Sequence, residues 1–254
     1  MTKISAVIIT KNEEANIERC LKSLHWTDEI VVVDSGSTDA TLEICKRYGC
    51  KIVETKWLGY GKTKQLAVNS ASHDWILSID ADEEVSPESI EIIKDAVANG
   101  KHKAYKVQIK SFYLGKLINH SGWGNEFKLR IFNKRYGNYN DAPVHETVLI
   151  EGEKPKLNAV FYHHTYPTLE KQCEKINRYS TLQGKQIFDK GKNYPLVLSP
   201  IFALNKFVTM YFFKLGFLDG KEGFILAFTS SCGVFMKYAK YWKLKRDKKI
   251  KKVN

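Results

Sequence analysis

The 254-residue sequence has little of what marks a secreted, zinc-stabilised or membrane-spanning protein. Its five cysteines are odd in number and form no CxxC pair, which argues against a disulfide framework and a structural zinc site. The first apolar run, residues 4–9, is too short for a signal-peptide core. No uncharged stretch near the C-terminus reaches the roughly 20 residues of a spanning helix. We therefore expect a reduced, cytoplasmic chain with no export signal or transmembrane segment.

Internal repeats, low-complexity linkers and an even spread of charge are also missing. The 40 basic residues exceed the 28 acidic residues by 12, but residues 237–254 alone hold nine Lys or Arg and one Asp. This tail supplies +8 of the net charge, which leaves +4 for the rest of the chain. A basic tail can contact anionic lipid or nucleic acid, or it can simply be solvated.

The first third of the sequence alternates strand and helix patterns. Two β-branched runs, residues 4–10 and 29–34, enclose a segment with apolar residues at helical spacing, residues 12–24. The alternation continues to a fourth strand, WILSID, at residues 75–80. Because the links are short, we expect an α/β fold with a mainly parallel sheet covered by helices on both faces.

After residue 100 the pattern changes twice. Mixed strands and loops follow first, so the later half of the sheet should be mixed. From residue 168 the chain turns helical, and apolar residues recur in steps of three and four: Phe224, Phe228, Cys232, Phe235, Tyr238 and Trp242. We expect an α/β domain over residues 1–190 and a helical, basic extension over residues 191–254.

Four carboxylates follow the fourth strand of this basic chain: Asp80, Asp82, Glu83 and Glu84. A helix is predicted to begin at Ser86, which would place all four in the loop between strand and helix. Ligands of open α/β sheets bind beyond the carboxyl ends of the strands, where Thr10, Asn12 and Asp34 are also expected.

The DAD sequence at residues 80–82 has two interpretations. Two carboxylates at i and i+2 can converge on one Mg²⁺ or Mn²⁺ ion, whose shell is usually completed by phosphate oxygens of a substrate. Acidic pairs are also common in surface loops, and Glu83 and Glu84 can favour a helix N-terminus instead.

Five segments, in this order, resemble the family 2 glycosyltransferases, which are inverting nucleotide-sugar transferases with the GT-A fold: AVIITKNEEANIERCLKSL, EIVVVDSGSTDAT, DWILSIDADEEVSPE, RIFN and VHE. The resemblance covers roughly residues 1–180. Later segments resemble more narrowly the lipopolysaccharide core glucosyltransferases that add β-glucose to an inner-core heptose: HHTY, KINRYS and FLDGKEGFILAFTSSCGVFMKYAKYW. The resemblance implies a UDP-sugar donor such as UDP-glucose, a divalent metal ion and a glycolipid or oligosaccharide acceptor.

The resemblance also implies roles for residues near the donor. Thr10 and Asn12 would line the uracil pocket, and Asp34 would accept a hydrogen bond from the base or ribose. Asp80 would meet the ribose and Asp82 the metal.

Some of these residues can also be explained by a structural role alone. Lys64 would face the donor phosphates, but a solvated helical lysine explains it equally well, and Gln65 stands where many relatives have Asn. Asp34 could instead only initiate a turn ahead of Gly36.

An inverting transfer needs a base that takes the proton of the acceptor hydroxyl. The acidic candidates are Glu146, Glu126 and Asp141. We favour Glu146, which follows the restricted APVHE turn, over Glu126, which could pair with Arg130 instead. Arg130 and Arg135 could also bind acidic groups of an acceptor.

Histidines 145, 163 and 164 raise the question of further metal ligands. A strand histidine is more often a hydrogen-bonded core group than a ligand. Several GT-A enzymes complete the metal shell with a late histidine, and by this resemblance His163 is the candidate.

The C-terminal stripe and its lysine-rich end are typical of a helix in a membrane interface, although packing on the transferase domain is the alternative. With a lipid-linked acceptor, we expect peripheral attachment to the inner face of the bacterial cytoplasmic membrane.

The sequence leaves two alternative functions. A sugar-phosphate nucleotidyltransferase should have a glycine-rich, basic loop after the first strand, where the sequence reads TKNEEAN. A non-enzymatic nucleic-acid or lipid-binding module would rely on the basic tail. A nucleic-acid module should interleave basic and exposed aromatic residues, so we expect no nucleic-acid partner.

Overall fold

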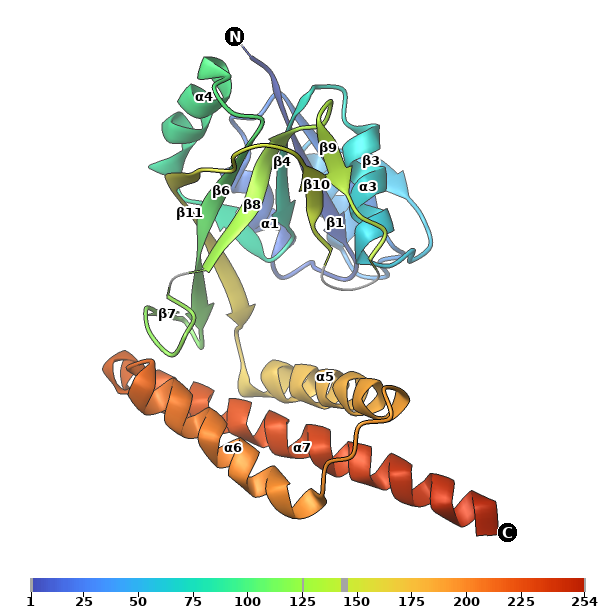
Figure 1. Cartoon of the computed structure of the whole chain (residues 1–254). Coiled ribbons are helices and arrows are strands. Elements are labelled where there is room, and N and C mark those ends of the chain that lie inside the picture. Colours follow the sequence, from blue (N-terminus) through green and yellow to red (C-terminus); the bar gives the residue numbers. More distant parts are fainter. Residues whose placement is uncertain (1, 125, 143–145, 254) are drawn as a thin grey trace. The chain divides into compact units, whose positions relative to one another are not determined.

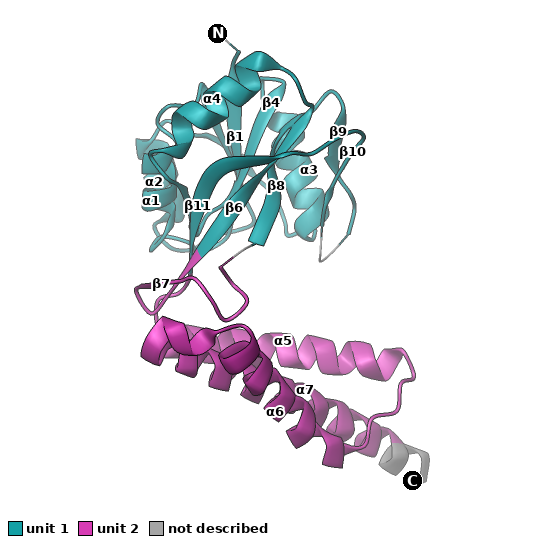
Figure 2. Cartoon of the chain, turned by 60° about the vertical axis from the view of Figure 1, so that its left-hand side comes forward, with its two compact units in different colours: residues 1–110, 125–164 teal, residues 111–124, 165–254 magenta. Residues whose placement is uncertain are grey.

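The structure is a computed structural model that describes residues 2–124, 126–142 and 146–253 (Figure 1). The chain forms two compact units, coloured separately in Figure 2. Unit 1 comprises Met1–Lys110 and Asn125–His164, and unit 2 comprises Ser111–Gly124 and Thr165–Asn254. The chain is divided between the units after residues 110, 124 and 164, and not at residue 190. The assignment of residues 1–190 to the transferase domain stays a prediction.

The first half of unit 1 alternates strands and helices as the sequence predicts. In chain order the elements are β1 (Ile4–Thr10), α1 (Ile17–Ser23), β2 (Glu29–Asp34), α2 (Thr41–Arg47), β3 (Lys51–Glu54), α3 (Tyr60–Ser70) and β4 (Trp75–Asp80). The four strands are parallel and lie in the order β3-β2-β1-β4. This order places the carboxyl ends of β1, β2 and β4 next to one another.

The remaining strands make the sheet mixed, as expected for its later half. They are β5 (Glu83–Val85), β6 (Ala104–Tyr113), β7 (Lys116–Ile118), β8 (Glu126–Asn133), β9 (Gly137–Tyr139), β10 (Val148–Ile150) and β11 (Lys156–Tyr166), with α4 (Ser89–Asn99) after β5. The sheet continues beyond β4 in the order β8-β6-β11-β5, and β8 is antiparallel to both β4 and β6. β9 and β10 form a separate hairpin.

Apolar side chains cover both faces of the sheet. In β4, Leu77 and Ile79 belong to the core that α1, α2 and α4 bury, whereas Ile76 belongs to the core beneath α3. Because strand side chains alternate between faces, a strand that is apolar at nearly every position must be covered on both sides. The apolar runs of β1 and β4 therefore account for the layered fold.

The helix predicted to begin at Ser86 begins at Ser89, and the carboxylate cluster does not lie wholly in a loop. Asp80 ends β4, and Glu83 and Glu84 lie on β5, which pairs antiparallel with β11. The prediction missed β5 because its inward side chain is charged. Glu83 is 1% exposed and forms an ion pair with the buried side chain of Arg130.

Unit 2 is mainly helical. Its helices are α5 (Leu169–Asp189), η1 (Leu196–Leu198), α6 (Ser199–Val208), η2 (Thr209–Phe213), η3 (Gly216–Asp219) and α7 (Gly220–Val253). The Thr168 hydroxyl caps α5 by accepting a hydrogen bond from the Lys171 amide. Lys240 of α7 donates hydrogen bonds to Asn177 and Ser180 of α5, which ties the two helices together.

One helical stretch of unit 2, Leu196–Phe213, is long and apolar enough to cross a membrane, by length and composition only. A search for uncharged runs misses it, because Lys206 interrupts the stretch. The stretch differs from the expectation that no C-terminal segment is long enough, whereas the absence of a transmembrane segment stays a prediction. Only 11% of this stretch is buried within the structure.

Candidate active site

The predicted donor residues lie side by side at the carboxyl edge of the parallel strands. Thr10 at the end of β1 lies opposite Asp34 at the end of β2, and Ile9 lies opposite Asp80 at the end of β4. Backbone pairing alone sets this arrangement, since three parallel strands end at the same level. The site that the sequence predicts is thus assembled from three separate segments.

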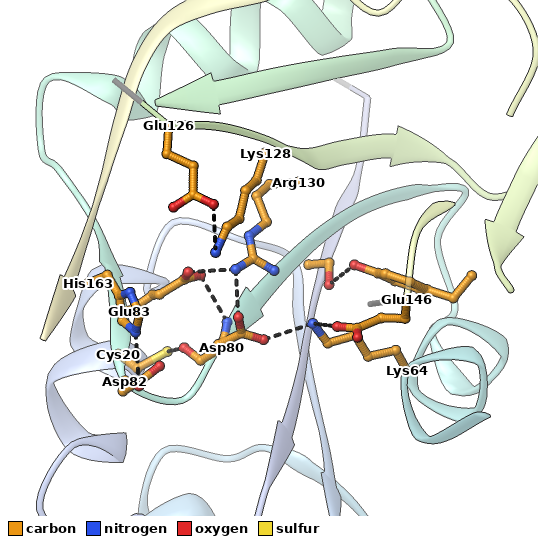
Figure 3. A network of polar contacts seen from close by, with 12 residues as sticks. Cys20, Lys64, Asp80, Asp82, Glu83, Glu126, Lys128, Arg130, Glu146 and His163 are labelled. Carbon is orange, nitrogen blue, oxygen red and sulfur yellow. Dashed lines mark hydrogen bonds and ion pairs between the residues drawn. The ribbon is translucent and has the colours of Figure 1, made fainter. Parts of the chain in front are cut away.

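Asp80 is held between two cations (Figure 3). The Lys64 Nζ atom lies 2.9 Å from Asp80 Oδ1, and the Arg130 Nη2 atom lies 2.6 Å from Asp80 Oδ2. Lys64 is 5% exposed, so the interpretation of this residue as a solvated helical lysine is wrong. Each oxygen of the Asp80 carboxylate therefore contacts one cation, and the two contacts hold the orientation of this side chain.

The electrostatics of these three groups support one another. Burial alone would raise the pKa of Asp80, but the charges of Arg130 and Lys64 outweigh it and hold this pKa well below its ordinary value. Burial alone would lower the pKa of Lys64, yet the charge of Asp80, with a smaller effect of Glu146, raises it. All three groups are therefore charged near neutral pH.

Glu83 is the functional-site residue that sequence reasoning misplaced. Its Oε1 atom lies 2.5 Å from Arg130 Nη2, and its Oε2 atom accepts a hydrogen bond from the Asp80 amide at 3.2 Å. Its carboxylate lies inside the fold and its pKa is raised, because burial outweighs the charge of Arg130. A charged residue between Leu129 and Ile131 in the FKLRIF strand is the signal that a buried acidic partner exists.

The two residues predicted to bind metal lie together. Asp82 Oδ2 and His163 Nε2 are 3.1 Å apart and form a hydrogen bond. The amide of His164 donates to the Asp82 carbonyl oxygen at 2.9 Å, so β11 holds the turn between β4 and β5 in place. Burial alone would lower the pKa of His163, but the hydrogen bond with Asp82 and nearby carboxylates raise it.

This pair has the geometry of two neighbouring metal ligands. Adjacent ligands of an octahedral magnesium ion lie about 3 Å apart, because each metal–oxygen distance is about 2.1 Å. Among the described residues there is no cluster of three or more His, Cys, Asp or Glu that could hold a metal. The 3.1 Å separation of Asp82 and His163 is compatible with two ligands of one cation, and their role as ligands remains a prediction.

Glu146 joins the same network through Lys64 of α3. Its Oε1 atom lies 2.8 Å from Lys64 Nζ, and its side chain is 16% exposed. The ion pair with Lys64 points the carboxylate toward the Asp80 side of the site (Figure 3).

The segment that precedes Glu146 packs against α3. The Gly61 amide donates to the Ala142 carbonyl oxygen at 3.1 Å, and a Cβ atom at Gly61 would lie 2.1 Å from the Asn140 carbonyl oxygen. Gln65 donates hydrogen bonds to the Tyr139 carbonyl oxygen and to Asp141. The residue that departs from the family pattern therefore has a role in holding this segment.

The other two candidate bases lie apart from this network. Glu126 has 53% of its side chain exposed and lies 3.6 Å from Lys128, so its predicted alternative pairing with Arg130 is wrong (Figure 3). Asp141 is exposed and accepts from Gln65. Among the three predicted bases, Glu146 is the one in contact with the Asp80 network.

The remaining predicted residues have mixed outcomes. His164 pairs with Glu84 at 3.0 Å, and Arg135 pairs with Asp74 at 2.6 Å at the other end of β4. His145 lies outside the described residues.

The nucleotide-side residues mostly build their own loops. Asp34 accepts hydrogen bonds from the Gly36 and Ser37 amides at 2.8 Å each, and from the Ser37 hydroxyl, as its turn-forming alternative predicts. Asn12 has a φ of 56°, which asparagine tolerates, and its side-chain oxygen accepts from the Thr38 amide. These contacts join the two loops that would border a nucleotide.

Thr10 differs from its neighbours. Its hydroxyl is buried and has no hydrogen-bond partner among the described residues. Unpaired buried hydroxyls are uncommon, and a bound polar ligand is one way to satisfy them. The predicted role of Thr10 in donor binding fits this observation but remains a prediction.

Comparison with known proteins agrees with this chemistry. Residues 5–149 match the model of the family described as "Glycosyl transferase family 2". The chain is 30% identical to the lipopolysaccharide core biosynthesis glycosyltransferase LpsC of Rhizobium meliloti, over 94% of this chain and 92% of that protein. It is 32% identical to the uncharacterized glycosyltransferase RT0209 of Rickettsia typhi, over 94% of this chain and 87% of that protein.

Among solved structures, the chain is similar to glucosyl-3-phosphoglycerate synthase from Mycobacterium tuberculosis in complex with Mn²⁺, UDP and glucosyl-3-phosphoglycerate. The identity is 28% over 44% of each chain, so the match spans less than half of that protein. The TM-score of 0.37 is too low to transfer any property from that structure.

Proposed function

Because the chain belongs to glycosyltransferase family 2, we propose that it transfers glucose from UDP-glucose, with inversion, to a saccharide of the lipopolysaccharide core that is anchored in a membrane. The donor and the inner-core acceptor follow from the sequence resemblance. The lipopolysaccharide core is supported by LpsC, a lipopolysaccharide core biosynthesis glycosyltransferase that aligns over almost the whole chain. This membership also favours a glycosyltransferase over the nucleotidyltransferase alternative.

The observation that carries the proposal is the pairing of Asp82 with His163 beside a fixed Asp80. The two side chains come from β4–β5 and β11, and their 3.1 Å separation suits a shared divalent cation. When bound, such a cation would neutralise charge on the diphosphate of the donor.

The other residues would position the reactants. Lys64 and Arg130 hold the two oxygens of Asp80, which would contact the ribose. The unpaired Thr10 hydroxyl would form a hydrogen bond with the base. Glu146 would take the proton from the acceptor hydroxyl as the new glycosidic bond forms. Its contact with Lys64, which also pairs with Asp80, supports this role.

Release of sugar from a panel of nucleotide sugars, measured with Mn²⁺, Mg²⁺ or EDTA, tests the proposal. We expect UDP-glucose to be turned over with a divalent ion and not with EDTA. Asp82→Ala should abolish metal-dependent turnover without changing the thermal unfolding midpoint. Asp95→Asn, an exposed carboxylate on α4 in the same unit, is the matched control for folding. Equal turnover in EDTA and Mn²⁺ would remove the metal from the proposal.

A further inference from the structure

Unit 2 holds nearly all of the surplus positive charge of the chain. It contains 19 Lys and Arg against 6 Asp and Glu, a net charge of +13, whereas the chain as a whole has +12. Unit 1 is therefore close to neutral, at −1. The charge extends beyond the C-terminal tail, since four lysines and no acidic residue lie within residues 190–218: Lys190, Lys192, Lys206 and Lys214.

The same part of unit 2 exposes an apolar face. On η1 and α6, Val197, Ile201 and Leu204 are 76%, 60% and 63% exposed and follow one another in steps of four and three. Phe212 and Phe213 of η2, which follows α6 directly, are 54% and 80% exposed. A soluble monomer rarely leaves so many large apolar side chains together in water.

The opposite face of α6 is already occupied. Phe202 lies 4.9 Å from Tyr238 of α7, and Phe207 lies 5.8 Å from Phe224, measured between ring centroids. Phe228 of α7 stacks on Phe224 at 6.2 Å and is itself 53% exposed.

We propose that the exposed face of η1, α6, η2 and η3 is the surface that docks this protein on an anionic lipid bilayer, lying in the interface without crossing the membrane. The inference deepens the proposed function and rests on it for the lipid-anchored acceptor. Apolar side chains enter the acyl boundary while lysines contact phosphate headgroups. The basic end of α7 adds charge to this surface but is not its inserting part.

Three features favour an interfacial position over a span. The 18 residues of Leu196–Phe213 would measure about 27 Å as a helix, slightly less than the hydrocarbon core of a bilayer. Lys206 lies near the middle of the stretch. One side of α6 packs along α7, a helix with nine Lys or Arg after residue 236, so lipid cannot surround it.

Vesicle binding of surface variants tests this assignment. Ile201→Ser combined with Leu204→Ser removes two side chains of the face. Leu149→Ser in unit 1, at 62% exposure, is the matched control. We expect the double variant to partition into phosphatidylglycerol-containing vesicles about tenfold more weakly than the wild type, and the control to bind equally well. Unchanged thermal midpoints would show that both proteins fold.

Insertion can be measured directly by lipid quenching. Phe213→Trp should gain fluorescence that brominated acyl chains quench, beyond the wild-type background, whereas Leu149→Trp should not. Full vesicle binding by the double variant, or no added quenching at position 213, would overturn the assignment.

The face could instead be covered by a second copy of the chain. A lipid-free wild-type dimer that the Ile201/Leu204 variant dissociates, with vesicle binding unchanged, would assign the face to that copy and overturn the proposal. If the wild-type protein binds vesicles but turns over no UDP-sugar, the proposed function is refuted and the docking surface still holds.

Discussion

Replacing Arg130 with methionine should destabilise unit 1 severely. Arg130 is 3% exposed, and its Nη2 atom contacts Asp80 and Glu83 at 2.6 and 2.5 Å. Methionine fills part of the space but leaves the Glu83 carboxylate, with a fully buried side chain, without its cation. Removing one partner of a buried ion pair costs about 3–5 kcal/mol, because the remaining charge is buried unpaired.

The pH dependence of this loss follows from the carboxylates. Without Arg130, the folded-state pKa of Glu83, which burial already raises, should rise further, and the pKa of Asp80 should lose one of the two charges that lower it. A carboxyl group with a raised folded pKa loses stability as pH rises above its unfolded pKa. The cost of Arg130→Met should therefore be largest near pH 8 and shrink toward pH 5. In the wild type, the lowered pKa of Asp80 has the opposite effect, and its contribution is lost as pH falls through that folded pKa.

A double-mutant cycle separates the ion pair from a packing defect. Glu83→Gln in the Arg130→Met background removes the unpaired charge and should recover about 2 kcal/mol or more. Hydrogen exchange of amides in β4 and β8, followed by mass spectrometry, reports on unit 1 apart from unit 2. A loss below about 1 kcal/mol for Arg130→Met, with no pH dependence and no recovery in the double variant, would refute the electrostatic reasoning.

Three further predictions concern catalysis and positioning. Glu146→Gln should keep UDP binding in a calorimetric titration and lower sugar transfer by about 10²- to 10⁴-fold; normal transfer would move the base to Glu126 or Asp141. Gly61→Ala should lower kcat, because the new Cβ would lie 2.1 Å from the Asn140 carbonyl oxygen and displace the Glu146 segment; unchanged kinetics would show that this loop does not position the base. His163→Ala should weaken Mn²⁺ binding in the presence of UDP by about tenfold or more, and an unchanged affinity would leave Asp82 as the one protein ligand of the two.

The charged side chains of the site form one ion-pair network. Lys64, Arg130, Asp80, Glu83 and Glu146 alternate in sign along one connected network. Each charge has a partner of the opposite sign within 3 Å, and such networks hold side-chain directions more firmly than isolated surface pairs do. Substitution of any single member should therefore disturb its neighbours as well.

Sequence reasoning succeeded where the information is local. The strands and helices up to β4 follow from apolar periodicity, because a buried strand or an amphipathic helix must place its apolar residues on its own faces. It failed at β5, where a charged residue faces inward, and at Leu196–Phe213, where one lysine interrupts an apolar helix. In both cases the local pattern was broken by a residue whose surroundings lie elsewhere in the chain.

By itself, the amino-acid order determined the α/β class, the family motifs, the edge of the sheet at which the site lies and the basic character of the C-terminal end. Only the tertiary structure decided that Arg130 joins Asp80 to Glu83, that Lys64 is buried between two carboxylates, and that the apolar face of α6 stays uncovered. The physical reason is that ion pairing and exposure depend on which distant segments of the chain pack together. The residues next to one another in the sequence do not show which segments these are.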